Sequence, residues 1–406
     1  MKTQQYPALI YLTLFTAPLL CHASYEQPLF DQQYFEQQWH WQTEAGYRAA
    51  SSSDMFEQQD AVVAQGALWW NPSYRGWVGQ LSALGYVDHR GEQELDLSVN
   101  ELFWMGQWGE LDWLVGKHRS DYGVSYAHRP LDIFLLFRQN PVGIQIEEGV
   151  GIVAGSYFTS QGELTVLYSD SHFLDIEDRL KQRGIGLRYY QLDFTSEWQG
   201  ILYWDDRRKL NAGGSWVSTF GDSWELHLEG RYQQRYQQPA LNSRVGDAQW
   251  QQPLSWHEQD HGWQMLVGGS YSSHLIGTVI MEYWNDGRAL SDQQWQSAIA
   301  TTAWLRAQQH YGNLWQAGGA LFSMENLQQH NLMLHWQKQR QPWTNRIDLM
   351  FSPQDQGLIA TASSEYELSQ RWLVRASLRY FGGASDSLYQ QLPESSIALL
   401  SLEGRF

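Results

Sequence analysis

The stretch between residues 224 and 232 alternates strictly between apolar and polar side chains. It reads Trp224-Glu225-Leu226-His227-Leu228-Glu229-Gly230-Arg231-Tyr232. Period-two alternation places successive side chains on opposite faces of a β-strand. One face of this strand would be apolar, with an aromatic ring at each end, and the other face would be charged. That pattern is typical of a lipid-facing band between two aromatic girdles, with the charged face turned to water.

The same alternation recurs near both ends of the chain. The apolar faces there comprise Trp39, Trp41, Thr43, Ala45 and Tyr47, and then Trp372, Val374, Ala376, Leu378 and Tyr380. A bilayer admits strands only as a closed barrel, because an open edge would leave unpaired N–H and C=O groups in hydrocarbon. The sequence therefore predicts an all-β fold, a transmembrane antiparallel up-and-down β-barrel spanning residues 24–406. We count about 20 strand-like segments, two of them starting near residues 295 and 313, with 18 strands as the alternative.

The expected connections support this architecture, because short and long ones alternate. Turn-like connections are expected at 71–73, 159–162, 220–222, 272–273 and 369–370. Longer ones are expected at 119–145, 171–182, 234–260 and 382–393. Short periplasmic turns and longer outer loops are features of outer-membrane barrels, as is an even number of strands.

Composition excludes several classes of protein. The 406 residues include 22 Trp and are 15% aromatic, so the chain is not disordered. Its formal net charge is -17, and it has no run of basic residues that could bind the phosphates of nucleic acid. A mean hydropathy of -0.50 is inconsistent with a bundle of membrane-spanning helices.

The N-terminus predicts export. Lys2 precedes an apolar stretch over 8–20 that is too short to span a bilayer, and Cys21-His22-Ala23 offers small residues for cleavage. We interpret residues 1–23 as a signal peptide; a lipid-carrying Cys21 is the less favoured reading. The only cysteine would leave with that segment, so disulfides cannot stabilise the rest of the chain.

The charged strand faces would line a water-filled lumen. The residues expected to line it are Glu44, Arg48, Arg188, Glu197, Lys209, Glu225, Glu229, Arg231, Arg346, Asp348, Arg375 and Arg379. The two signs are nearly matched, which suits small polar solutes better than a highly charged polymer. The acidic excess of the chain would then lie mainly in loops and turns.

A long, glycine-punctuated segment at 119–145 is the candidate for a loop that folds inward and narrows the lumen. The residues expected at the constriction are Lys117, His118, Arg119, Asp121, Arg129, Asp132 and Arg138. The alternative is a solvated surface loop.

A family resemblance rests on two stretches. Gly116-Lys117-His118-Arg119, followed by Tyr122-Gly123-Val124 and Pro130-Leu131-Asp132, resembles a motif of outer-membrane porin-like barrels, including the alginate-export-like ones. His118, Tyr122 and Ser125 stand where that motif has Gln, Trp and Gly. The ending Leu402-Glu403-Gly404-Arg405-Phe406 resembles the C-terminal signal of such barrels. The resemblance implies an outer-membrane channel of a Gram-negative bacterium, with Phe406 read by the barrel assembly machinery.

Signals for catalysis are weak. His257-Glu258-Gln259-Asp260-His261 matches the zinc-protease pattern, but Pro253 and Gly262 argue against the helix that this chemistry needs, so a polar loop is expected. His227 and His335 are interpreted as polar lining, while Trp304 and Tyr203 could form a path for sugars.

These observations predict a channel for passive diffusion of small polar solutes, not an enzyme, with no cofactor and no metal. Its expected partners are outer-membrane lipid, lipopolysaccharide and the solutes, without nucleic acid. Two alternatives stay open: a barrel for export or assembly of a surface polysaccharide, and an outer-membrane enzyme.

Overall fold

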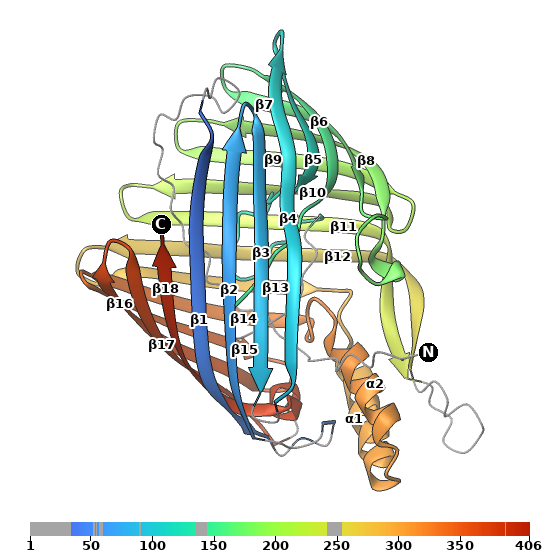
Figure 1. The fold of residues 1–406 in the computed structure, drawn as a ribbon. Helices are drawn as coiled ribbons and strands as arrows, with labels where there is room; N and C mark the ends of the chain where they lie inside the picture. The colour runs from blue at the N-terminus through green and yellow to red at the C-terminus, as the bar shows by residue number, and fades with distance from the viewer. Residues whose placement is uncertain are drawn as a thin grey trace.

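The computed structural model describes residues 34–51, 53, 55–56, 60–88, 91–134, 144–241, 254–385 and 387–406. These residues form one sheet of 18 antiparallel strands (Figure 1). The sheet closes because β1 (Glu36–Ala50) pairs with β2 (Ala61–Tyr74) on one side and with β18 (Glu394–Arg405) on the other. Every strand lies beside its neighbours in sequence. The predicted all-β, up-and-down barrel is therefore confirmed.

The remaining strands are β3 (Trp77–Asp88), β4 (Gln93–Trp108), β5 (Leu111–His118), β6 (Val150–Phe158), β7 (Gly162–Asp170), β8 (Arg183–Leu192), β9 (Ser196–Asp205), β10 (Lys209–Phe220), β11 (Trp224–Leu241), β12 (Leu254–Ser273), β13 (Gly277–Asp286), β14 (His330–Arg340), β15 (Trp343–Ser352), β16 (Gly357–Ser369) and β17 (Trp372–Gly382). Two α-helices, α1 (Asp292–Ala307) and α2 (Tyr311–Phe322), and the 3-10 turns η2 (Asp178–Leu180) and η4 (Leu388–Gln391) complete the elements.

The count of 18 strands corrects the main prediction of about 20 and agrees with its alternative. The two surplus segments, expected near residues 295 and 313, are the helices α1 and α2, which lie together beyond the barrel rim in Figure 1. Every other predicted segment corresponds to one strand, in the predicted order.

Local chemistry explains why these two segments are helical. Ser291 caps α1, and its side chain and that of Gln294 form a reciprocal capping box. The buried residues of α1 then recur at helical spacing, as in Trp295, Ala298 and Leu305. With 3.6 residues per turn, these residues form one buried stripe along the helix. The predicted strands would need the same aromatic and aliphatic residues to alternate with a period of two.

The two ends of the chain close the barrel together. Trp39 and Phe406 exchange both main-chain hydrogen bonds, each with an N···O distance of 2.8 Å. The Phe406 ring also packs edge-on against Trp372, with ring centroids 6.0 Å apart. The terminal residue is thus the last rung of the β1–β18 seam. The predicted signal segment, residues 1–23, lies outside the described residues.

The two faces of the wall differ as the alternation predicts. On β11, the side chains of Leu226 and Leu228 are exposed, whereas Glu229 and His227 are buried. Because the sheet is closed, the exposed apolar face is the outer one, and the polar face lines the interior. No α-helix in the described part of the chain is long and apolar enough to cross a membrane.

The connections fall into two groups at opposite ends of the barrel. One end carries short turns, such as those at 75–76, 109–110 and 370–371, together with the first residues of β1 and the end of β18. The other end carries the longer connections, including 119–149 and 287–329. One expected loop is wrong: most of 234–260 is strand, because β11 runs to Leu241 and β12 begins at Leu254. The polar, Gln-rich sequence there continues the hairpin's hydrogen-bonded ladder beyond its neighbours.

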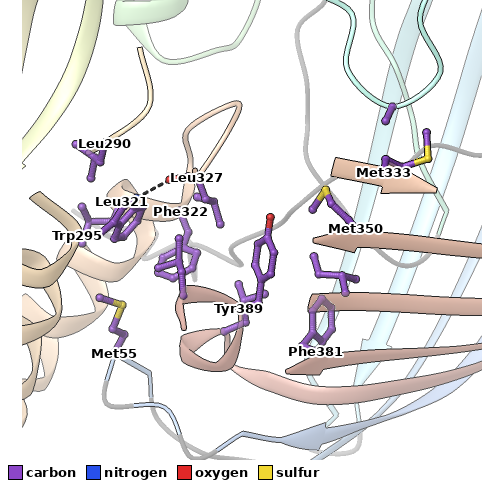
Figure 2. Packing of buried hydrophobic residues seen from close by; sticks show 14 of the residues in the cluster. Met55, Leu290, Trp295, Leu321, Phe322, Leu327, Met333, Met350, Phe381 and Tyr389 are labelled. Carbon is purple, nitrogen blue, oxygen red and sulfur yellow. Dashed lines mark hydrogen bonds between the residues drawn. The ribbon is translucent and has the colours of Figure 1, made fainter. Parts of the chain in front are cut away.

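The long connections pack into the barrel mouth over an apolar cluster (Figure 2). Met55 of the β1–β2 connection, Trp295 of α1, Phe322 of α2 and Tyr389 of η4 all belong to it. Their partners on the inner wall are Leu266, Ile280, Met333, Met350, Ile359, Phe381, Ile397 and Leu399. The inner face of β12–β18 is therefore apolar where the loops cover it.

An arginine on the outer face should destabilise the barrel. We expect Leu228→Arg to lower the free energy of unfolding by about 2–4 kcal/mol, because the guanidinium would enter hydrocarbon. Reversible urea unfolding in phosphatidylcholine vesicles measures this change. Asp222→Arg, in the turn before β11, is the control and should be nearly neutral. Equal effects of both substitutions would contradict a lipid-facing position for Leu228.

Candidate functional site

The interior face of β15–β17 carries a row of paired charges. Arg346 of β15 and Arg375 of β17 both bind Glu365 of β16, and the Arg375 Nε lies 2.6 Å from the Glu365 Oε1. The Arg375 side chain keeps 27% of its surface exposed, the largest fraction of the three. Two guanidiniums therefore share one carboxylate on this part of the wall.

Further predicted lining residues lie along the same wall. Glu44 accepts a hydrogen bond of 2.6 Å from Gln65, and Arg48 lies 3.8 Å from Glu394. Arg379 donates to the Thr361 hydroxyl at 2.8 Å. His335 of β14 and Asp348 of β15 lie 2.6 Å apart. The wall thus alternates cationic and anionic groups.

The opposite wall also matches its charges. Arg188 of β8 donates to Glu163 at 3.1 Å and to Gln199 at 2.9 Å. Glu197 accepts a hydrogen bond of 2.8 Å from the Tyr190 hydroxyl. Arg231 of β11 is buried, and both of its acceptors are neutral. It donates at 2.9 Å to the Asn211 side chain and at 3.3 Å to the Pro130 carbonyl.

Lys209 differs from the other predicted lining residues. Its ammonium lies 5.5 Å from the ring centroid of Trp204, which is exposed on the outer face, and donates to the Asp206 carbonyl. A positive φ of 61° at Lys209 turns the chain there, where β10 begins. The alternation that assigned Lys209 to the interior is broken at this residue.

The connection between β5 and β6 is described over residues 119–134 and 144–149, and we name these residues the interior loop. Leu131 and Phe134 pack with inner-wall residues of β6, β7 and β9 in one apolar cluster, and Ile144 and Ile146 pack with Ala67 and Trp69 of β2 in another. The described parts of the loop thus touch both sides of the interior.

One glycine of the wall makes room for this loop. A Cβ atom added to Gly213 on β10 would lie 2.5 Å from the Leu131 Cδ2 atom and 2.7 Å from the main-chain oxygen of Gly230 on β11. A side chain at this position would therefore displace both Leu131 and the neighbouring strand.

Four of the residues predicted at the constriction lie at the end of β5 and the start of the interior loop. Lys117 binds Glu148 at 2.7 Å, and the His118 Nδ1 lies 3.0 Å from Glu101. Arg119 binds Glu147 and lies 3.2 Å from Asp121. Arg129 and Asp132 lie further along the loop, and Arg138 lies outside the described residues. The predicted set lacks the carboxylates Glu101, Glu147 and Glu148, which are distant in sequence from their basic partners, so nearness in sequence gives no signal for them.

Asp132 organises the loop from within. Its Oδ1 accepts the main-chain N–H groups of Tyr122 at 2.7 Å and Gly123 at 2.6 Å, and its Oδ2 lies 3.7 Å from Arg129. Burial raises the pKa of Asp132 to about 6, although these donors act in the opposite direction. The carboxyl group therefore titrates near neutral pH.

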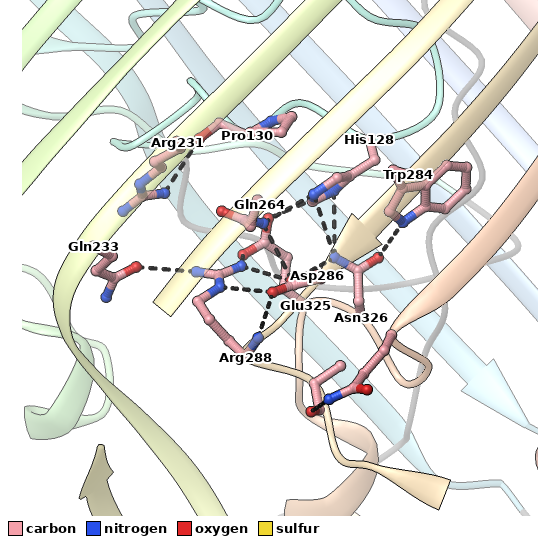
Figure 3. A network of polar contacts seen from close by, with 12 residues as sticks. His128, Pro130, Arg231, Gln233, Gln264, Trp284, Asp286, Arg288, Glu325 and Asn326 are labelled. Carbon is pink, nitrogen blue, oxygen red and sulfur yellow. Dashed lines mark hydrogen bonds and ion pairs between the residues drawn. The ribbon is translucent and has the colours of Figure 1, made fainter. Parts of the chain in front are cut away.

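A second polar network joins the interior loop to the mouth (Figure 3). Arg288, after β13, binds Asp286 through two nitrogens at 3.0 and 2.9 Å, and binds Glu325 at 2.5 Å. His128 of the interior loop lies 2.9 Å from the Gln264 side chain. Burial lowers the pKa of His128, so the neutral imidazole is favoured at pH 7.

Other candidate residues do not assemble into reactive sites. The stretch His257–His261 lies within β12, so the polar loop expected there is wrong and the two histidines are not on a helix. Trp304 lies in α1 beside His310, whereas Tyr203 is buried against Phe134 on the barrel wall. They form no common path. Among the described residues, no group of three or more His, Cys, Asp or Glu side chains could hold a metal ion.

Comparison with solved structures finds a similar fold in Gram-negative bacterial proteins of low sequence identity. OccAB1 of Acinetobacter baumannii matches with a TM-score of 0.56 and 8% identity, over 92% of this chain and 96% of that one. OccK8 (OprE) of Pseudomonas aeruginosa matches with 0.54 and 7%, over 91% and 98%. OccK5 (OpdH) of the same organism matches with 0.51 and 10%, over 91% and 98%. No protein-family model and no curated protein matches the chain.

The raised pKa of Asp132 predicts a pH-dependent contribution to stability. A carboxyl group whose folded pKa is raised favours the folded state fully below its unfolded pKa, and this contribution is lost as the pH rises through about 6. Relative to Asp132→Asn, the native protein should therefore lose up to about 3 kcal/mol between pH 4 and pH 7. Urea unfolding of both proteins across this range measures the difference. Parallel pH profiles would contradict the assignment.

Proposed function

We propose that this protein is an outer-membrane channel through which small polar solutes diffuse passively. The observation that carries the proposal is a closed barrel with an apolar exterior and an interior wall of paired charges, against which the interior loop packs. In this arrangement the short-turn end faces the periplasm and the long-loop end faces outward.

The chemistry of the wall supports small solutes over a polymer. Arg346 and Arg375 share Glu365, and His335 lies beside Asp348, so cationic and anionic groups alternate over short distances. Closely spaced opposite charges orient water and small dipoles, whereas their potential cancels over the length of a long polyanion. Export of a surface polysaccharide would favour a lumen of one sign.

The interior loop would set the aperture of the channel. Its basic and acidic side chains, Arg119 with Asp121 and Glu147, retain between 29% and 36% exposure. The constriction is thus proposed to lie at residues 117–121.

Conductance in planar bilayers tests the proposal. Purified protein should insert and give discrete ion-conducting steps, because a water-filled lumen passes small ions. A barrel that inserts without conducting would reject the channel. Hydrolysis or modification of lipid by the purified protein would favour the enzyme instead.

Ion selectivity should depend on Arg375. Replacing it in Arg375→Gln removes one of two guanidiniums beside Glu365, so the cation-to-anion permeability ratio should rise about twofold. Reversal potentials in a salt gradient measure the ratio. Arg183→Gln is the control, because Arg183 binds Asp170 at the end of β8, where more than half of its side chain is exposed. A ratio that changes equally in both variants would contradict a passage along β15–β17.

A further inference from the structure

A buried glutamate of the wall binds the main chain of the interior loop. Glu229 lies on β11, and its Oε2 accepts the Val124 N–H at 2.9 Å and the Ser125 hydroxyl at 2.8 Å. Its Oε1 accepts the Leu131 N–H at 2.6 Å. Both oxygens of one carboxylate are therefore occupied by donors that lie about one hundred residues away in sequence.

A second glutamate, Glu282 on β13, does the same for the next two residues of the loop. Its Oε1 accepts the Tyr126 N–H at 2.6 Å, and its Oε2 accepts the Ala127 N–H at 2.8 Å. The His227 Nε2 lies 2.8 Å from the same Oε1. Gly268 on β12, between the two strands, leaves room for this contact, since a Cβ there would lie 2.1 Å from the His227 Nε2.

These contacts satisfy both partners at once. Glu229 and Glu282 are 3% and 2% exposed, and a buried carboxylate is stable only with donors around it. The loop N–H groups equally need acceptors once water is excluded. The two carboxylates belong to strands that are hydrogen-bonded on both sides. The wall therefore fixes the position of the loop residues that they bind.

We infer that Glu229 and Glu282 are positioning residues that hold residues 124–131 inside the barrel. The consequence for solutes rests on the proposed function: a loop held at this depth fixes the aperture. These residues contact no solute in this scheme, and they act through the main chain of the loop.

Cysteine accessibility tests the inference without requiring conduction. In a chain carrying Cys21→Ala, the substitution Ala127→Cys introduces a single thiol at a loop position that is 6% exposed. We expect slow labelling by a membrane-impermeant maleimide in this background. Adding Glu229→Gln should raise the labelling rate about tenfold or more, because the amide replaces a charged acceptor with a group that also donates.

The matched control is Glu403→Gln. Glu403 lies on β18, is 8% exposed, and pairs with His40 and Arg405 instead of the interior loop. Its substitution should leave the labelling rate unchanged. Glu229→Asp, which keeps the charge but shortens the reach, should give an intermediate rate. Equal rates in Glu229→Gln and Glu403→Gln would overturn the inference.

Two further readouts separate structural failure from loop release. Only the compact barrel band on unheated gels is scored for labelling, so an unfolded variant does not contribute. Among folded variants, the single-channel conductance of Glu229→Gln should differ from that of the parent by at least about 1.5-fold. A parent that does not conduct rejects the proposed function alone, whereas a conducting parent with unchanged labelling in Glu229→Gln rejects the positioning role alone.

Discussion

Closure of the main-chain hydrogen bonds is the constraint on which the rest of this structure depends. The rungs between β1 and β18, from His40–Arg405 to Ala50–Glu394, remove the only two free edges that the sheet would otherwise have. Once the edges are gone, each strand needs only an apolar outer face and a face that tolerates water. The interior is then free to carry charges, histidines and a folded loop.

The interior repeats the same requirement at a smaller scale. The interior loop makes no strand or helix over residues 119–134, so its N–H groups need acceptors from elsewhere. Asp132 supplies one carboxylate acceptor from within the loop, and Glu101, Glu229 and Glu282 supply further acceptors from the wall. These carboxylates accept the loop N–H groups, as the carbonyl groups of a neighbouring strand do in the barrel wall. The carboxylates in this part of the interior therefore bind the main chain of the loop in addition to contributing charge.

The sequence predicts the wall better than the contents of the barrel. Strict alternation in segments such as Trp224–Tyr232 and Trp372–Tyr380 identifies strands because a two-faced environment leaves no other periodicity. It fails for α1 and α2, whose Trp, Ala and Leu residues fit two periods. It also fails at Lys209, where a positive φ at the start of β10 turns the side chain toward Trp204 on the outer face.

The candidate site could be predicted only in part for a related reason. Lys117, His118 and Arg119 were expected together because they are adjacent in sequence, and they meet acidic partners at the start of the interior loop. The sharing of Glu365 by Arg346 and Arg375 depends on strand register, which alternation alone does not fix. The contact between Leu131 and Glu229 depends on how a loop folds back across the barrel. Such contacts carry no local pattern.

The connection that contains α1 and α2 has a consequence for how such barrels diversify. It leaves the sheet after Asp286 and returns at His330, and Asn285 and His330 are already paired across the two strands. The insertion therefore changes neither register nor strand number. A segment of this kind can be lengthened, shortened or exchanged without moving any strand, so the shape of the long-loop end can vary independently of the membrane-embedded wall.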